Sequence, residues 1–450
     1  MINNINNYIK VNNLIKENDI IYVALSGGAD STCLLHTLLQ LKQKYNLNIK
    51  AIHINHMIRG EEANRDMRHC KTLCNQLNVE LLIKKIDVVA YKNNKKITLE
   101  QAGREIRYRE FSMLEGKVAL GHNKNDNVET ILMNILRGSS GEGLKGIKIK
   151  NNKYIRPLLD TYRSEIETYC VNNNLKYVID STNNEDEYFR NSIRNQVIPL
   201  LNKITNKDIN ENILRLSKLV GEDTDFINEI ASNLYAKVVS LEKDKVVIDN
   251  IQIVNTDNVL IRKIIRKAIK TIKGNLVDIE FSHTQSIIKM IKENLTGKKI
   301  NLPNNISVLI QFNKTYVYEE KENTTYEYVL NIPGDTIIPI KNMIIKTTIV
   351  DKFSKENLFS NIQYFNYDYI KDKLHIRNRR EGDVIKPYKG NGSKKLKKYF
   401  IDKKIDRFLR NDLLLIAEGK NIIYIYGYEY NKDYIPTNNH KILRVEFLER

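Results

Sequence analysis

The sequence predicts an α/β fold: a doubly wound, mainly parallel sheet, followed by a helical middle domain and a small α+β C-terminal domain. Two observations predict it. Strand-like and helix-like segments alternate over the first two hundred residues, and the pattern then becomes helical and, from about residue 302, β-rich. This alternation is typical of a parallel sheet covered by helices on both faces, with ligands at the carboxyl ends of the strands. We expect the domains to be 1–205, 206–325 and 326–450.

Composition and charge narrow the function classes. The chain has 450 residues, of which 42% are hydrophobic, and its net charge is +18. The length favours two or three domains, and the basic surplus favours a polyanionic partner. The sequence shows no signal peptide and no apolar stretch of about 18 residues, so we expect a cytoplasmic protein without membrane association. Its four cysteines have neither a zinc-binding nor a disulfide spacing.

The elements follow in chain order from their side-chain patterns. Short apolar runs predict strands, and apolar residues at spacings of three and four predict helices. The strands expected in the first domain are 20–25, 49–55, 79–89, 117–120 and 176–179. Helices are expected at 210–238, 258–273 and 281–294, and a basic helical run at 394–400 that buries Leu396, Tyr399 and Phe400.

A glycine-containing loop joins the first strand to a leucine-rich helix. Its sequence is Ser26-Gly27-Gly28-Ala29-Asp30-Ser31. Backbone N–H groups converge at such a junction, glycine lets the chain approach a ligand closely, and the helix dipole favours an anion. A carboxylate beside phosphates needs a bridging cation, so Asp30 predicts Mg²⁺ and the loop predicts a metal-nucleotide complex. The alternative is a glycine turn with a helix N-cap; neither a Walker loop nor a Rossmann fingerprint is present.

A second polar segment, residues 121–130, follows another apolar strand and opens a helix. His122, Asp126 and Glu129 are spaced i, i+4 and i+7, so they share one helical face near its N-terminal end. The functional interpretation is a binding or catalytic face, and the alternative is a solvated face with an acidic first turn.

These segments resemble known motifs. The loop 26–31 is similar to that of the PP-loop ATP pyrophosphatases. Residues 121–130 resemble the Gly-His-x-x-Asp-Asp-x-x-Glu-Thr motif of one branch, the tRNA(Ile)-lysidine synthetases, with Asn125 where that family usually has the first aspartate. Further stretches resemble the same family: residues 102–108, 137–144, 180–183 with Arg190 and Arg194, and 376–383 with Pro387.

The resemblance implies a reaction and its substrates. ATP, bound with Mg²⁺, is cleaved between its α- and β-phosphates, and AMP is transferred to the wobble cytidine of an isoleucine tRNA with a CAU anticodon. Free L-lysine then replaces AMP at carbon 2, which gives lysidine and converts codon specificity from AUG to AUA. A homodimer is compatible with the family.

Roles for individual residues follow from this reaction. The loop 26–31 would hold the nucleotide, with Asp30 on the metal. Asp126 and Glu129 suit the lysine ammonium, and His122 is a candidate proton acceptor. Arg104 could hold the lysine carboxylate or the adenylate phosphate.

The basic surplus is concentrated near the C-terminus. Residues 371–410 contain fifteen Lys or Arg and five Asp or Glu, so 15 − 5 = +10 of the net charge lies there. This region predicts contacts with tRNA phosphates, and the alternative is a solvated helix face. The expected nucleic-acid contacts are Arg190, Arg194, Arg377, Arg379, Arg380, Lys394, Lys395, Lys397 and Lys398.

Two other functions remain open. Another PP-loop tRNA-modifying enzyme, a thiolase or an amidotransferase, would need reactive cysteine pairs or an ammonia source, and neither has an obvious motif here. A non-catalytic, nucleotide-regulated RNA-binding protein would bind ATP without releasing pyrophosphate. An assay for AMP and pyrophosphate with lysine and tRNA separates these alternatives.

Overall fold

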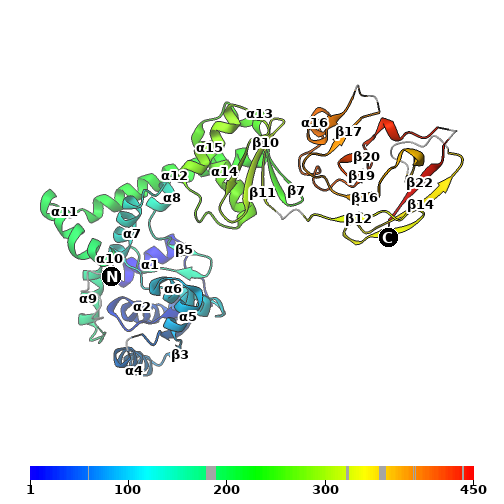
Figure 1. Ribbon diagram of the computed structural model, residues 1–450. Helices are drawn as coiled ribbons and strands as arrows, with labels where there is room; N and C mark the ends of the chain where they lie inside the picture. Colours follow the sequence, from blue (N-terminus) through cyan, green and yellow to red (C-terminus); the bar gives the residue numbers. More distant parts are fainter. Residues whose placement is uncertain are drawn as a thin grey trace. The chain divides into compact units, whose positions relative to one another are not determined.

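The computed structural model describes residues 1–58, 60–178, 189–320, 324–353, 361–388, 390, 392–437 and 440–449 (Figure 1). The chain divides into two compact units. The first comprises Met1–Ile300 and Val308–Val317, and the second comprises Asn301–Ser307 and Tyr318–Arg450. The finer division at residues 205 and 325 stays a prediction.

The N-terminal part of the first unit is built on a sheet of order β3-β2-β1-β4-β6-β5. Its pairs are parallel except for β5 with β6, so the predicted doubly wound, mainly parallel sheet is confirmed. The strands are β1 (Ile20–Ala24), β2 (Asn48–Asn55), β3 (Glu80–Lys85), β4 (Lys117–Ala119), β5 (Lys150–Asn151) and β6 (Tyr154–Ile155).

Helices cover both faces of this sheet because successive residues of its strands, which point to opposite faces, are apolar. Val23 packs with Leu34 and Leu38 in one core, whereas Tyr22 packs with Phe111 on the opposite face. The helices are α1 (Ile2–Val11), α2 (Ala29–Gln40), α3 (Lys42–Tyr45), α4 (Glu61–Gln76), α5 (Val88–Lys95), α6 (Leu99–Ser112), α7 (Lys124–Leu136), α8 (Gly141–Leu144), α9 (Arg163–Asn172), α10 (Phe189–Ser192) and α11 (Ile198–Thr205), with a π-helical turn at Ile193–Val197.

Two expected strands of this domain differ from the structure. The strand expected at 79–89 ends at Lys85, because the carboxylate of Asp87 accepts a 2.9 Å hydrogen bond from the Ala90 amide and begins α5. Residues 176–178 form no strand. Instead the Val178 N–H donates to the Gly27 carbonyl at 2.9 Å, so this segment contacts the glycine loop.

The middle of the chain contains the predicted helices, together with a sheet of order β7-β8-β11-β10-β9. The hairpin of β7 and β8 was missed, although two Val-rich runs flank a charged turn there. The elements are α12 (Asn210–Val238), β7 (Val239–Glu242), β8 (Lys245–Asp249), α13 (Asn250–Ile253), α14 (Asn258–Lys273), α15 (Phe281–Lys292), β9 (Lys299–Leu302), β10 (Ile306–Gln311) and β11 (Lys314–Glu319).

The C-terminal unit contains two sheets, of orders β12-β16-β19-β20-β17-β18 and β13-β14-β22-β15, with β21 paired to β20. Its basic helix α16 begins at Leu396, two residues later than expected, because Lys394 and Lys395 pair with β17. The elements are β12 (Glu327–Val329), β13 (Gly334–Ile338), β14 (Met343–Val350), β15 (Ile362–Asn366), β16 (Leu374–Arg377), β17 (Val384–Ile385), β18 (Lys394–Lys395), α16 (Leu396–Asp402), β19 (Leu415–Glu418), β20 (Asn421–Ile425), β21 (Glu429–Tyr430) and β22 (Ile442–Glu449).

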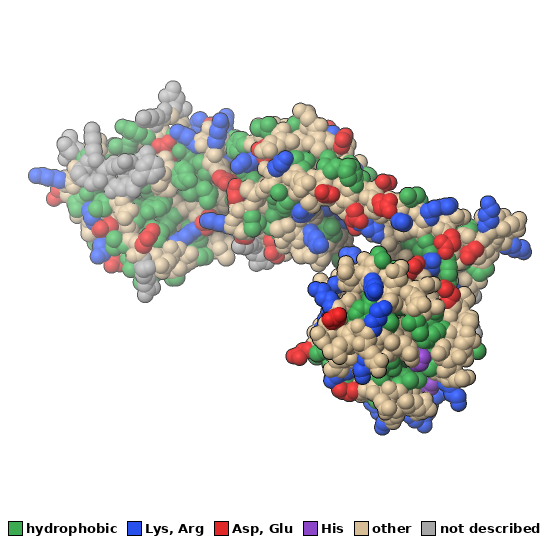
Figure 2. All heavy atoms as spheres, turned by 180° about the vertical axis from the view of Figure 1, so that it is seen from behind, with side chains coloured by type: hydrophobic (Ala, Val, Ile, Leu, Met, Phe, Trp, Pro, Cys, Tyr) green, Lys and Arg blue, Asp and Glu red, His purple; other side chains and the backbone are tan. Residues whose placement is uncertain are grey.

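The surface carries both signs of charge. On the face drawn in Figure 2, Lys and Arg side chains are spread over the surface, with Asp and Glu among them. Within the described ranges, no helix is both long and apolar enough to cross a membrane.

Candidate active site

The loop 26–31 is ordered by its own hydroxyl groups. The Ser31 Oγ accepts hydrogen bonds from the amides of Ser26 (3.2 Å) and Gly27 (3.3 Å) and donates to the Gly28 carbonyl (3.1 Å). Gly27 has φ +95°, and a Cβ there would lie 3.3 Å from the Cys70 Sγ, so this position requires glycine. Gly28, with φ −74°, does not require it for backbone conformation. The Ser31 hydroxyl thus holds the glycine turn at the start of α2, and the N-terminus of a helix favours an anion.

Asp30 links this loop to the segment that opens α7. Its Oδ1 accepts a 2.9 Å hydrogen bond from the Asn123 side-chain amide. Burial raises the pKa of Asp30, and the bond from Asn123 partly opposes that effect. Gly121 permits the approach, because a Cβ there would lie 3.2 Å from the Ser31 nitrogen. Since β1 and β4 are parallel neighbours, both motifs lie at the same edge of the sheet.

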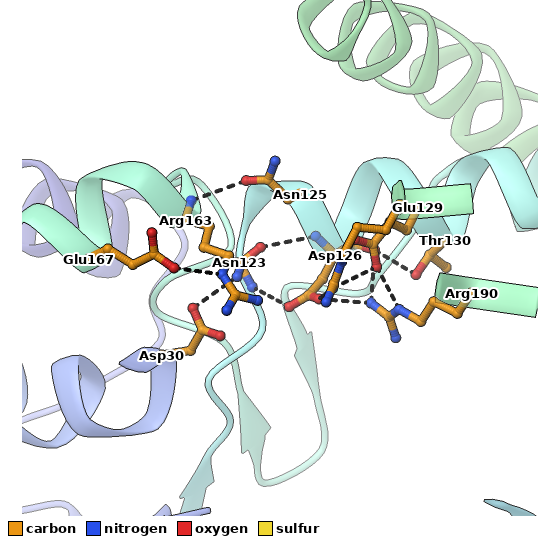
Figure 3. A network of polar contacts seen from close by, with 10 residues as sticks. Asp30, Asn123, Asn125, Asp126, Glu129, Thr130, Arg163, Glu167 and Arg190 are labelled. Atoms are coloured by element: carbon orange, nitrogen blue, oxygen red, sulfur yellow. Dashed lines mark hydrogen bonds and ion pairs between the residues drawn. The ribbon is translucent and has the colours of Figure 1, made fainter. Parts of the chain in front are cut away.

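Asp126 and Glu129 are ion-paired with two arginines (Figure 3). Arg190 Nε donates to Glu129 at 2.6 Å and its Nη2 to Asp126 at 2.9 Å. Arg194 Nε donates to Glu129 at 2.5 Å and its Nη2 to Asp126 at 3.2 Å. The second carboxylate oxygen of Asp126 accepts a hydrogen bond from the backbone N–H of Asn123, which completes the N-terminal cap of α7. Glu129 is only 1% exposed, so the two arginines neutralise a carboxylate that would otherwise be costly to bury.

Asn125, the departure from the expected motif, has a structural partner. Its side-chain carbonyl accepts a 3.1 Å hydrogen bond from the backbone N–H of Arg163, the first residue of α9 (Figure 3). The Arg163 side chain in turn pairs with Glu167 at 2.9 Å. An amide oxygen serves as well as a carboxylate for this contact, so Asn125 can join α7 to α9 without an acid at this position.

His122 lies among positive charges. Burial lowers its pKa first, and the positive charges of Arg156, Arg190, Arg107 and Arg104 lower it further, to about 3. Its Nδ1 is buried and has no hydrogen-bond partner among the described residues. The imidazole is therefore neutral at physiological pH and is a weak proton acceptor in the ligand-free protein.

A cavity of about 600 Å³ lies at the carboxyl ends of β1, β2 and β4. Ser26, Asp30, His122 and Arg107 supply polar groups to its wall, and Phe111 is among its apolar residues. The volume is typical of a small-molecule site, and about half of the lining residues are polar or charged, which suits a charged ligand.

Comparisons with known proteins show which family the chain belongs to. A family model described as a PP-loop domain matches residues 2–201, and one described as the TilS substrate C-terminal domain matches residues 374–447. A tRNA(Ile)-lysidine synthase of Clostridium acetobutylicum is 38% identical over 99% of both chains. The chain belongs to the tRNA(Ile)-lysidine synthase family. One from Caldanaerobacter subterraneus subsp. tengcongensis is 34% identical over 99% of this chain and 97% of its own.

A solved structure of a TILS C-terminal domain is also similar to this chain. It is 19% identical and covers 28% of this chain and 98% of its own length, with a TM-score of 0.25.

Several residues predicted from the tRNA(Ile)-lysidine synthase motifs lie at one sheet edge. The loop 26–31 and His122 border the cavity, and Asp126 and Glu129 follow on α7. Arg104 stacks on the ring of Tyr108, with its guanidinium carbon 5.5 Å from the ring centroid. Arg190 and Arg194 pair with Asp126 and Glu129, and their predicted contacts with nucleic acid stay a prediction. The motif segment 180–183 lies outside the described residues.

The predicted RNA contacts of the C-terminal unit have different environments. Arg377 is 1% exposed and forms two hydrogen bonds with the Asp383 carboxylate, at 2.8 and 2.9 Å. Its guanidinium is enclosed and neutralised in this structure, and its contact with RNA stays a prediction. Arg380 pairs with Glu327 and Lys394 with Asp402. Arg379 bonds to Asn411, while Lys395, Lys397 and Lys398 are exposed.

Sequence reasoning missed four residues of the site. Asn123 had a usable signal, because asparagine directly before a helix is a preferred N-cap. Arg107 lies in the stretch 102–108 that resembles the family but was not singled out. Arg156 and Arg163 follow β6 in the sequence, and no pattern there marks them as neighbours of His122 or Asp30.

Proposed function

We propose that this protein is an ATP-dependent carbon-nitrogen ligase that attaches L-lysine to carbon 2 of the wobble cytidine of a CAU-anticodon isoleucine tRNA. AMP and pyrophosphate are released. The observation that carries the proposal is the cavity into which the loop 26–31 and His122 both open. A nucleotide and a second reactant can react only where both motifs serve one site.

Mg²⁺ fits at Asp30 when the nucleotide supplies further ligands. The carboxylate lies at the phosphate-binding loop, and Asn123 occupies only its Oδ1. Within the described residues, no group of three or more His, Cys, Asp or Glu could hold a metal by itself. Mg²⁺ is usually bound by one or two carboxylates together with substrate phosphates, so Asp30 is the residue that would hold it. When bound, Mg²⁺ offsets negative charge on the pyrophosphate leaving group.

The first step transfers AMP. The cytidine O2 forms a bond to the α-phosphorus of ATP, and the bond from that phosphorus to the bridging oxygen breaks, so pyrophosphate leaves. Arg107 lines the cavity, and Arg104 and Arg156 lie near enough to lower the pKa of His122. These guanidinium groups suit the α-phosphate, whose developing charge they would stabilise.

The second step needs lysine as a free amine. Its ε-amine attacks carbon 2 of the cytidine, and AMP leaves with O2. The reference pKa of the ammonium is about 10.4, so the site must first bind the cation and then remove a proton. We assign the binding to Asp126 and Glu129, where the ammonium would take the place of Arg190. Arg190 is the more exposed of the two arginines, at 38% against 26% for Arg194.

Replacing Arg190 would also prepare His122 to accept the proton. Arg190 is one of the four arginines that lower the pKa of His122. If Arg190 moves away and nucleotide phosphate neutralises Arg104 and Arg107, the remaining causes are burial and Arg156. The pKa of His122 then rises towards its ordinary value of about 6.5.

Mass spectrometry of the wobble nucleoside tests the function. The protein is incubated with ATP, L-lysine and an unmodified transcript of the tRNA. A cytidine heavier by one lysine minus one water is expected, with stoichiometric AMP and pyrophosphate. Without lysine, adenylated tRNA should accumulate. ATP binding with no pyrophosphate release would instead identify a non-catalytic RNA-binding protein.

The cysteines disfavour a thiolase. Cys33, Cys70, Cys74 and Cys170 are all free and buried. Burial raises the pKa of Cys70 to about 12, which suppresses the reactive thiolate. A homodimer and a cytoplasmic location stay predictions.

A further inference from the structure

Three arginines of the C-terminal unit lie close together. Arg379 follows β16, and Arg407 and Arg410 lie in the segment between α16 and β19. Arg379 Nε donates a 2.6 Å hydrogen bond to the Asn411 side chain, which joins the two segments. Burial and then the charge of Arg407 lower the pKa of Arg379, and burial followed by the charges of Arg379 and Arg407 lowers the pKa of Arg410. Arg379 and Arg410 thus lie within range of each other's positive charge and of that of Arg407.

Carboxylates do not neutralise Arg379 and Arg410. Arg379 donates to the neutral Asn411 amide, and Arg410 Nε donates to the Ile405 carbonyl at 2.9 Å. Neither arginine has an ion pair with a described residue, whereas Arg377, Arg380 and Lys394 in the same region each have one.

The nearby acids already have other partners. Asp383 is the carboxylate that pairs with Arg377. Asp406 accepts a 3.0 Å hydrogen bond from the Phe408 amide. These acids act on Arg379 and Arg410 only from a distance, so an added anion would stabilise these two guanidinium groups.

The segment that carries Arg407 and Arg410 is fixed at several points. The Ile405 amide donates to the Phe400 carbonyl at 2.9 Å, which joins the segment to the end of α16. The Phe408 ring packs edge-on against Tyr318, with centroids 4.8 Å apart. The backbone that carries Arg407 and Arg410 is therefore held in place before a ligand binds, which lowers the entropic cost of binding.

We propose that Arg379, Arg407 and Arg410 form a binding site for a phosphodiester of the tRNA substrate. This inference rests on the proposed function. Guanidinium groups bind phosphate oxygens through two parallel N–H bonds, which lysine cannot do. The exposed residues Lys395, Lys397 and Lys398 belong to the strand and helix that lead into the same segment, so they can contact neighbouring phosphates. This continuity favours a nucleic-acid backbone over a single small anion. Arg407 and Arg410 are additions to the RNA contacts predicted from the sequence.

Binding of the unmodified tRNA transcript to the full-length protein tests the site, by fluorescence anisotropy over a salt series. The double variant Arg407→Ala/Arg410→Ala should raise Kd about 10-fold or more. It should also reduce the slope of log K against log salt by about 1.5 to 2 units, for two lost phosphate contacts. Arg410→Lys keeps the positive charge but loses the planar guanidinium that donates two parallel hydrogen bonds. It should therefore raise Kd by less than Arg410→Ala does.

Arg444→Ala is the matched control, because Arg444 is in the same unit but pairs with Glu446 at 2.9 Å. It should leave Kd and the salt slope unchanged. Circular dichroism of each variant checks folding. Wild-type Kd and slope in a folded double variant would overturn the proposal, as would an equal effect of Arg444→Ala.

Lysine attachment separates this inference from the proposed function. At saturating tRNA the double variant should keep the wild-type kcat while its KM for tRNA rises. If the wild-type protein binds tRNA through these arginines but attaches no lysine, the proposed function fails and the phosphate site stands. If lysine is attached normally and the double variant keeps its tRNA affinity, only the phosphate site fails.

Discussion

The substitution Glu129→Gln tests the lysine site most directly. It preserves the shape of a side chain that is 1% exposed and accepts bonds of 2.5, 2.6 and 3.0 Å from Arg190 and Arg194, but it removes the negative charge. A hydrogen bond between charged groups contributes about 1.5–3 kcal/mol. The KM for lysine should therefore rise about 10- to 150-fold, since 1.4 kcal/mol is a factor of ten.

The assay measures the two half-reactions separately. Transfer of radiolabelled AMP to tRNA without lysine should stay near the wild-type rate, and adenylated tRNA should accumulate when lysine is added at its wild-type KM. Glu167→Gln is the matched control: Glu167 also pairs with an arginine, Arg163, in the same network, but it is half exposed and not assigned to lysine. It should leave the KM for lysine unchanged.

One result would refute this assignment. If Glu129→Gln loses AMP transfer and keeps the wild-type KM for lysine, the carboxylate serves the nucleotide or only holds the two arginines. Loss of one member of a buried ion pair destabilises by about 3–5 kcal/mol, and the partial exposure of both arginines reduces that figure. Denaturant unfolding of the variant shows whether a loss of activity follows from loss of the fold.

Three further predictions concern the nucleotide, the histidine and the basic helix. Asp30→Asn should abolish pyrophosphate release and leave the Kd for tRNA unchanged; near-wild-type turnover at saturating Mg²⁺ would contradict a metal role. NMR titration of the ligand-free protein should find the His122 imidazole neutral down to about pH 3, and a pKa near 6.5 would show that neither burial nor the arginines lower it. Because that pKa is lower than in the unfolded chain, His122 stabilises the fold fully above about pH 6.5 and the contribution is lost as pH falls towards 3. Replacing Lys394, Lys395, Lys397 and Lys398 by glutamate should weaken tRNA binding and reduce the salt slope by at least about 2–3 units, because Lys394 already pairs with Asp402; ATP binding without tRNA should survive, and an unchanged Kd would restore the interpretation as a solvated helix.

The sequence predicted what depends on local pattern. The alternation of strands and helices, the loop 26–31 and the polar start of α7 could all be found, because each is encoded by neighbouring residues. The strand at 79–89 was predicted too long because Asp87 caps a helix within an otherwise apolar run. The sequence could not show which of the two glycines the backbone conformation requires. The backbone angles show that it is Gly27, since only Gly27 has a positive φ.

Contacts between distant segments could not be predicted in this way. The spacing from Glu129 to Arg194 is 65 residues, and nothing in either segment indicates that the arginine neutralises the acid. In the motif around Arg377, a local pattern suggested a contact, but a residue from elsewhere in the motif already occupies the side chain. An arginine in a basic stretch suggested an RNA contact, but the chain turns after β16 and brings Asp383 to within 2.8 Å of its guanidinium.

The net charge counted along a sequence overstates the number of basic side chains that are available to bind RNA phosphates. Residues 371–410 carry a surplus of +10, yet Arg377, Arg380, Lys386 and Lys394 each have a carboxylate partner. An arginine that already pairs with an acid gains little from a phosphate, because it must first give up an equivalent contact. Arg379 and Arg410 donate to neutral oxygens and give up no ion pair when a phosphate binds. The salt dependence of tRNA binding should therefore correspond to far fewer phosphate contacts than the fifteen basic residues of this region, and arginines without carboxylate partners should account for a disproportionate share of it.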